Sequence, residues 1–187
     1  MSSVRIIAGE FRGRLLRFPE ETGLRPTPDR VRETLFNWMG QRLDGLSCLD
    51  LFAGSGALGF EAASRGAAHV LMVEKNRKVI DALKKNAEIL KTGMKIEIVC
   101  ADAVKFVSSL RLSKKRFDVI FIDPPFNQGW IERIEPDLLH LLKADGSLYI
   151  ESGRRLKAYD GMQMVREGQA GQVYYHLMQR GEQHDAG

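Results

Sequence analysis

The chain of 187 residues contains little cysteine and little histidine, two and four residues respectively. Cys48 and Cys100 stand far apart in apolar runs, and two separated cysteines predict neither a disulfide framework nor a zinc site. We expect both to be small buried hydrophobic residues. Because the four histidines show no metal-ligand spacing either, the sequence favours a protein without a metal ion.

Long apolar runs are also absent. The longest are too short to span a bilayer, and no signal-peptide pattern is present, so we expect a cytoplasmic location and no membrane partner. With 44% hydrophobic and 28% charged residues, the composition is that of a globular protein. The length predicts one α/β domain, and we expect it to be a monomer.

No lysine occurs before Lys75, although the N-terminal region is basic. Residues 1–32 contain seven arginines against four acidic residues. Arginine presents a planar fork that matches phosphate groups and stacks on bases. Together with a net charge of +4, this favours a polyanionic partner, while a solvated charged face is the alternative. The arginines are Arg5, Arg12, Arg14, Arg17, Arg25, Arg30 and Arg32.

Short apolar runs alternate with helical patterns from residue 47 onward. This alternation predicts βαβ units, and hence a doubly wound, mostly parallel sheet with helices on both faces. Two further runs after residue 161 have no helix between them, so they predict a C-terminal antiparallel hairpin joined at 168–171. We expect strands at 47–52, 69–74, 95–100, 117–122 and 146–151, a helix at 76–91, and hairpin strands at 162–166 and 172–179.

The N-terminal residues predict a separate small element. Two β-rich runs, 4–8 and 14–18, surround a turn bounded by glycines, which is typical of a β-hairpin. Thr27 suits the N-cap of a following helix, and Pro28 suits its first position. We therefore divide the chain into an N-terminal hairpin extension (1–24), a main domain (25–181) and a disordered tail (182–187).

A glycine-rich loop follows the first core strand. Gly54, Gly56 and Gly59 match the G-x-G-x-x-G pattern, and Glu74 stands about the right distance on to bind ribose hydroxyls. A dinucleotide site would explain this pattern. Any nucleoside bound here needs the same close backbone approach, so the loop alone leaves the ligand open.

Acidic residues end four of the expected strands. Asp50, Glu74 and Asp123 stand at strand ends and Asp102 just beyond one. Because ligands bind at the carboxyl edge of open α/β sheets, these acids predict a site there. Asp50 suits a cationic ligand group and Asp102 suits the amino group of adenine, although a single acid such as Asp102 is equally typical of a helix cap.

The segment Asp123-Pro-Pro-Phe126 indicates the chemistry. Proline has no N–H and a fixed φ, so the chain leaves its strand in a stiff turn. The Asp123 carboxylate and the Pro124 carbonyl can then accept the two hydrogens of a planar amine, with Phe126 stacking on its ring. Whether Asp123 also takes the proton after the reaction stays open. A plain strand exit is the alternative for the two prolines alone.

These motifs together resemble the class I S-adenosylmethionine-dependent methyltransferases. Segments 24–38, 50–59 and 123–126, with the hairpin motifs at 5–9 and 12–14, are similar to the bacterial family that methylates N2 of guanine 966 in 16S ribosomal RNA. The resemblance implies a seven-stranded sheet, S-adenosylmethionine as cofactor, and 16S rRNA within a small ribosomal subunit or an assembly intermediate as substrate. The target base must leave its helix for its amine to be reached.

The resemblance and the motifs give three sets of expected site residues. The catalytic set is Asp123, Pro124, Pro125 and Phe126. The cofactor set is Thr27, Arg30, Asp50, Phe52, Ala53, Gly54, Ser55, Gly56, Glu74, Lys75, Asp102 and Ala103. The RNA set is Arg5, Phe11, Arg12, Arg14, Arg17 and Arg25, although a folded-over hydrophobic contact is the alternative for Phe11.

Other functions stay open at this point. An amino-methyltransferase acting on another RNA or DNA base shares the chemistry. An NAD-dependent oxidoreductase explains the glycine loop and Glu74, but not residues 123–126 or the terminal hairpin. An RNA-binding or assembly protein on the same fold is the non-enzymatic alternative. A pyrimidine C5 methyltransferase is excluded, because it needs a cysteine near the fourth strand and neither cysteine lies there.

Overall fold

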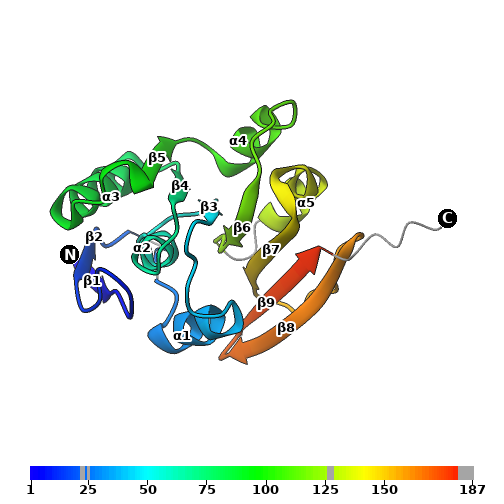
Figure 1. The fold of residues 1–187 in the computed structure, drawn as a ribbon, viewed down its shortest axis with the longest axis horizontal. Coiled ribbons are helices and arrows are strands. Elements are labelled where there is room, and N and C mark those ends of the chain that lie inside the picture. The colour runs from blue at the N-terminus through cyan, green and yellow to red at the C-terminus, as the bar shows by residue number, and fades with distance from the viewer. Residues whose placement is uncertain (22–23, 25, 126–128, 181–187) are drawn as a thin grey trace.

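The computed structural model describes residues 1–21, 24, 26–125 and 129–180 (Figure 1). The predicted tail and the predicted site residues Arg25 and Phe126 lie outside the described residues. Among the described residues, no helix combines the length and the apolar character that crossing a membrane requires.

A seven-stranded sheet in the order β5-β4-β3-β6-β7-β9-β8 forms the centre of the molecule. The strands from β3 to β7 pair in parallel, whereas β9 is antiparallel to both β7 and β8. The predicted fold class, including the C-terminal hairpin, is confirmed. The bounds are β3 (Ser47–Asp50), β4 (His69–Glu74), β5 (Ile96–Cys100), β6 (Phe117–Ile122), β7 (Leu142–Ser152), β8 (Met162–Ala170) and β9 (Val173–Arg180).

Helices cover both faces of this sheet (Figure 1). Successive strand residues point to opposite faces. Cys48 and Val119 therefore pack into the cluster with α1, α2 and α3, while Leu49 and Ile120 pack into the cluster with α4 and α5. The helices are α1 (Asp29–Trp38), α2 (Ala57–Ser64), α3 (Arg77–Leu90), α4 (Ala103–Ser109) and α5 (Trp130–Leu141), and a 3-10 turn, η1, spans Gly93–Lys95.

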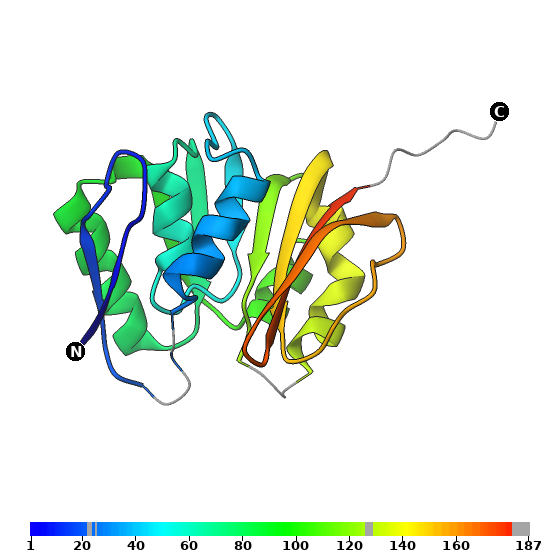
Figure 2. The ribbon, with the colours of Figure 1, turned by 90° about the horizontal axis from the view of Figure 1, so that it is seen from below.

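The N-terminal hairpin, β1 (Ser2–Arg5) and β2 (Leu15–Phe18), forms its own two-stranded sheet beside α3 (Figure 2). Asn86 of α3 holds β2 by two hydrogen bonds, accepting from the Arg17 N–H (3.1 Å) and donating to its carbonyl (2.9 Å). The hairpin turn lies against α2 so closely that a Cβ at Gly9 would stand 1.8 Å from the Ser64 carbonyl oxygen. The hairpin is thus fixed to the main body by specific contacts.

Three local predictions were wrong. Helix α1 begins at Asp29, its N-cap residue is Pro28, and no side chain caps it; the Thr27 hydroxyl binds Asp123 instead. Gly168 lies inside β8 rather than in the turn. Cys48 is buried as expected, but Cys100 is exposed because β5 is an edge strand whose last residue lies at the rim of the sheet.

Candidate active site

The four predicted acids do lie at one edge of the sheet. Asp50 and Glu74 are the last residues of β3 and β4, and Asp102 and Asp123 follow β5 and β6. Strand β3 is the central one of these, because β4 and β6 pair with it on opposite sides. The chain crosses the sheet between β5 and β6, so the switch point of the topology lies between β3 and β6. Ligands bind at such switch points in open α/β sheets.

The glycine loop turns directly after β3. Its backbone is held by an N–H of Ala53 that donates to the Val73 carbonyl (3.0 Å) and by an N–H of Gly54 that donates to Glu74 (3.1 Å). Gly56 has φ +81°, and a Cβ there would stand 2.6 Å from the Phe60 ring. Only glycine fits this position without displacing the helix that follows. Ser55 is buried, and its hydroxyl accepts from the Ala57 N–H (3.3 Å).

Asp50 is the most buried acid of the edge, with 1% of its surface exposed. Its Oδ2 accepts a hydrogen bond from the Gly59 N–H (3.1 Å), whereas its Oδ1 has no hydrogen-bond partner among the described residues. Burial raises the pKa of Asp50 to about 7, and the hydrogen bond from the Gly59 N–H opposes this shift. A buried oxygen of this kind needs a donor, and a ligand ammonium or sulfonium beside it would favour the ionised carboxylate.

Glu74 and Asp102 bind backbone groups. Glu74 accepts from the N–H groups of Lys75 and Asn76 (both 2.8 Å) and from the glycine loop, so it ties the end of β4 to that loop. Asp102 is the N-cap of α4 and accepts from the Lys105 N–H (3.1 Å). The helix-cap alternative for Asp102 is therefore present, while contacts of either acid with a nucleoside stay a prediction. Ala103 is buried at the start of α4.

Two side chains near the loop, Phe52 and Lys75, contact the ring of Trp130, which the sequence did not predict as a site residue. Trp130, at the start of α5, lies edge-on to Phe52 with ring centroids 5.9 Å apart. The Lys75 ammonium stands 5.0 Å from the centre of the same indole. Phe52 and Lys75 were expected at the site, whereas Trp130 was not. Trp130 lies in the first turn of α5, and no signal in the sequence predicted that this helix starts at 129–130.

On the other side of the switch point, the Thr27 hydroxyl donates to Oδ2 of Asp123 (3.1 Å). Burial raises the pKa of Asp123 well above its usual range, and the neighbouring Glu151 carboxyl raises it further. Glu151 is itself buried and accepts from the Tyr149 hydroxyl (2.8 Å). Glu151 ends the apolar run 146–151. An acid at the end of an expected strand was the signal for the other four acids, and the same signal predicts Glu151 as a fifth.

A cavity of about 170 Å³ opens at Pro124, the residue that follows Asp123. Sites for drug-sized ligands measure roughly 300–1,000 Å³, so this one fits a single small ring. Pro124 is buried and Pro125 exposed at its wall. Its lining residues are Pro124, Pro125, Gly129, Trp130, Ile131, Glu132, Glu151, Ser152, Gly153 and Arg154. A larger depression of about 590 Å³, between residues 155–158 and β8, lies away from the acids that end the strands.

The expected RNA contacts divide into two groups. Arg5, Arg12, Arg14 and Arg17 are exposed on the hairpin. Phe11 is not: only 7% of its surface is accessible, it packs in the core cluster, and its N–H donates to the Ser64 hydroxyl (2.9 Å). The hydrophobic alternative is therefore the correct one for Phe11, because the turn folds back on α2.

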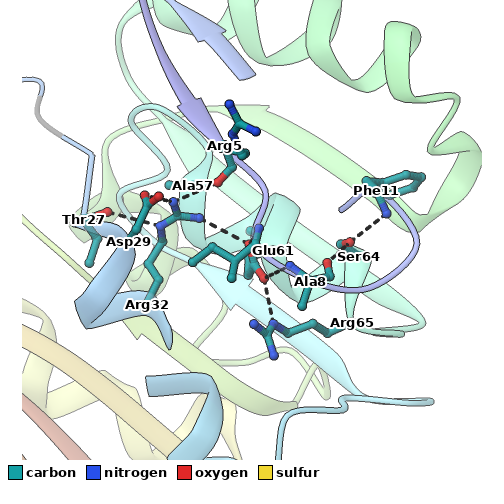
Figure 3. Close-up of polar contacts among 12 residues, drawn as sticks. Arg5, Ala8, Phe11, Thr27, Asp29, Arg32, Ala57, Glu61, Ser64 and Arg65 are labelled. Carbon is teal, nitrogen blue, oxygen red and sulfur yellow. Dashed lines mark hydrogen bonds and ion pairs between the residues drawn. The ribbon is translucent and has the colours of Figure 1, made fainter. Parts of the chain in front are cut away.

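Arg32 also differs from the prediction of a basic face, because it is completely buried (Figure 3). Its guanidinium pairs with Glu61 (3.3 Å) and Asp29 (2.6 Å). It also donates to the carbonyls of Arg5 (2.9 Å) and Thr27 (3.2 Å). Arg32 thus links the hairpin to the residue that binds Asp123. Arg30, on the same helix, is exposed.

Comparisons with known proteins agree with this architecture. The family model described as "Conserved hypothetical protein 95" matches residues 4–179. "Ribosomal RNA small subunit methyltransferase D" of Escherichia coli (strain K12) is 42% identical, covering 95% of this chain and 90% of that protein. The protein of the same name from Haemophilus influenzae is 40% identical, covering 94% and 93%.

Solved structures show the same fold. "Putative methyltransferase yhhF from Escherichia coli" is 42% identical with a TM-score of 0.85, covering 96% of this chain and 98% of that one. "SMU.776, a putative methyltransferase complexed with SAH" has a TM-score of 0.65 at 16% identity, which is a likeness of fold alone.

Proposed function

Because this chain belongs to the family described as Conserved hypothetical protein 95 and is a relative of Ribosomal RNA small subunit methyltransferase D, we propose that it transfers a methyl group from S-adenosylmethionine to the exocyclic N2 amine of a guanine in small-subunit ribosomal RNA. The observation that carries this proposal is the pair of carboxyl groups at the switch point. Asp50 stands beside the glycine loop on β3, and Asp123 stands beside the cavity after β6.

The residues around the glycine loop fit the cofactor. S-adenosylmethionine supplies an electrophilic methyl group on a sulfonium, and it also carries an amino-acid ammonium. Oδ1 of Asp50, which has no hydrogen-bond partner in the described part of the chain, suits a cationic group, and the loop at 53–56 allows close backbone approach. Glu74 suits the ribose hydroxyls, Asp102 with Ala103 suits the adenine, and Phe52, Lys75, Thr27 and Arg30 complete the proposed set.

The acceptor side works mainly by positioning. The N2 lone pair of guanine is delocalised into the ring, and its protons are far too weakly acidic for a carboxylate to remove before attack. Asp123 and the Pro124 carbonyl therefore accept the two amine hydrogens and orient the nitrogen. Thr27 holds the Asp123 carboxylate for this task. After the transfer the nitrogen is cationic and acidic, so its proton leaves easily, and Asp123 is the nearest base to take it.

The exposed arginines of the hairpin supply the RNA contact. Arg5, Arg12, Arg14 and Arg17 lie on one small element, and guanidinium groups bind phosphates without reading sequence. A base presented to the cavity must be unpaired or flipped out. We therefore propose that residues 1–24 bind the RNA backbone while residues after β6 hold the base.

The test is transfer of tritiated methyl groups from S-adenosylmethionine onto undermethylated small subunits, followed by nucleoside analysis. The expected product is N2-methylguanosine; N6-methyladenosine or no product would refute the proposal. Calorimetry with S-adenosylhomocysteine and with NAD separates this function from an oxidoreductase. Asp123→Ala separates it from an RNA-binding protein, because only an enzyme loses its activity through this change.

A further inference from the structure

A second carboxyl group stands beside Asp123. Ile122 of β6 and Ile150 of β7 are register partners on neighbouring parallel strands, so Asp123 and Glu151 are the next residue of each strand. Glu151 has only 3% of its surface exposed. Buried glutamates are rare unless they are paired, and Glu151 interacts with two neutral hydroxyls, that of Tyr149 at 2.8 Å and that of Thr27.

Glu151 also faces the space where a base would bind. It lines the 170 Å³ cavity together with Pro124, Pro125 and Trp130. The cavity is therefore bordered by a glutamate of β7 and by an aromatic residue of α5. The hydroxyl of Tyr149 holds Oε1 of Glu151 and the hydroxyl of Thr27 holds Oδ2 of Asp123. The Thr27 hydroxyl also interacts with Glu151. A carboxylate offers about four acceptor sites, so each carboxyl group can still accept a hydrogen bond from a further donor.

We propose that Glu151 is a base-recognition residue that, together with Asp123, accepts hydrogen bonds from the Watson–Crick edge of the target guanine. The inference rests on the function proposed above and adds the choice of base. Guanine presents N1–H and N2–H₂ as neighbouring donors, which match two carboxylates. Adenine presents a lone pair at N1, so one carboxylate would face an acceptor. Selection of this kind is strong, because a mismatch leaves a buried polar group unpaired.

The experiment compares Glu151→Ala and Glu151→Gln with the wild-type chain on undermethylated small subunits. We expect Glu151→Ala to lower kcat/KM by about 100-fold, as for loss of a buried hydrogen bond to substrate. Binding of S-adenosylhomocysteine, measured by calorimetry, should stay within about twofold of wild type. The glycine loop follows β3, and β6 separates β3 from β7, the strand that carries Glu151. Glu167→Gln, at an exposed glutamate of β8 paired with Arg155, is the matched control and should keep wild-type activity.

The pH profile tests whether the two carboxyl groups face each other. Asp123, Tyr149 and Tyr175, the register partner of Glu151 on β9, are the titratable groups beside Glu151. Asp50 acts on Asp123, and Glu132 and Arg154 line the same cavity. Glu151→Gln keeps the shape of the side chain but removes a negative charge next to Asp123. Asp123 then ionises at lower pH, so the midpoint of the rise in kcat/KM should move to lower pH. A Glu151 carboxyl group that does not face Asp123 would leave that midpoint in place.

The outcomes are distinguishable. If the wild-type chain makes no N2-methylguanosine, the proposed function itself fails. If it does, and Glu151→Ala stays within threefold of wild type or Glu151→Gln leaves the midpoint unchanged, the role of Glu151 is refuted while the function stands. The isosteric Glu151→Gln variant keeps the test valid even where the alanine variant does not fold.

Discussion

Replacing Glu61 by alanine removes the centre of the buried network that joins the N-terminal hairpin to the main body. Neither Glu61 nor Arg32 has any exposed surface. The Glu61 carboxylate pairs with Arg32 (3.3 Å) and Arg65 (2.8 Å). It also accepts from the backbone N–H groups of Ile7 (2.8 Å) and Ala8 (3.0 Å). The variant therefore leaves a buried guanidinium with less counter-charge and two backbone donors without their acceptor.

The expected cost is large. Breaking a buried ion pair from one side costs about 3–5 kcal/mol, since the remaining charge stays buried. The free energy of unfolding of a single domain is roughly 5–15 kcal/mol, so Glu61→Ala should remove a large fraction of it. For a chain of this size, each kcal/mol shifts the melting temperature by about 2–4 °C. The shift should accordingly be on the order of 10 °C.

Urea unfolding followed by circular dichroism measures this change as a lower midpoint. Asp44→Ala is the control, because it breaks an exposed pair with Arg42 and surface pairs contribute little; its midpoint should match wild type. The double variant Arg32→Met with Glu61→Leu should be more stable than Glu61→Ala, since the completely buried Arg32 guanidinium is then absent and only Arg65 loses its partner. A Glu61→Ala midpoint within error of wild type would show that the network does not stabilise the fold.

Three further predictions concern the site. Asp123→Asn should lower kcat by about 100-fold or more and leave calorimetric binding of S-adenosylhomocysteine unchanged; a variant with wild-type turnover would contradict the orienting role. Asp50, with its pKa raised to about 7 from 3.8, stabilises the fold fully below pH 4 and progressively less as the pH rises through 7. Chemical unfolding of Asp50→Asn should lack this decline, on the order of 4 kcal/mol; a parallel decline in both proteins would be inconsistent with the shift. Replacing Arg12 and Arg14 by alanine should raise KM for small subunits and reduce the slope of log KM against log salt by about 1.5, whereas Arg77→Ala on α3 should not; equal slopes would place the RNA elsewhere.

Much of the fold follows from local patterns in the sequence. Apolar runs such as 69–74 and 117–122 are typical of buried parallel strands and form β4 and β6 with the predicted bounds. The acids at their ends lie at one edge because parallel strands end together. The glycine loop and the Asp123 turn are equally local, so their places in the fold were predictable.

Contacts between distant segments were not predictable in this way. The buried position of Arg32 depends on Glu61, 29 residues later, and a single sequence does not show which charges will meet. Phe11 is buried because a turn that looks exposed folds back on α2. The bond between Thr27 and Asp123 spans 96 residues and replaces the local helix cap that the sequence favours.

The strand order has a consequence for how such a protein changes over time. Apart from Thr27 and Arg30, the proposed methyl-donor residues come from one uninterrupted stretch, 47–103. The residues proposed to hold the base come from another stretch, 117–152, and the two stretches meet in the sheet where β3 pairs with β6. A chimera that takes residues 117–152 from a relative, joined within 110–116, should therefore take on the acceptor preference of that relative and keep the same methyl donor.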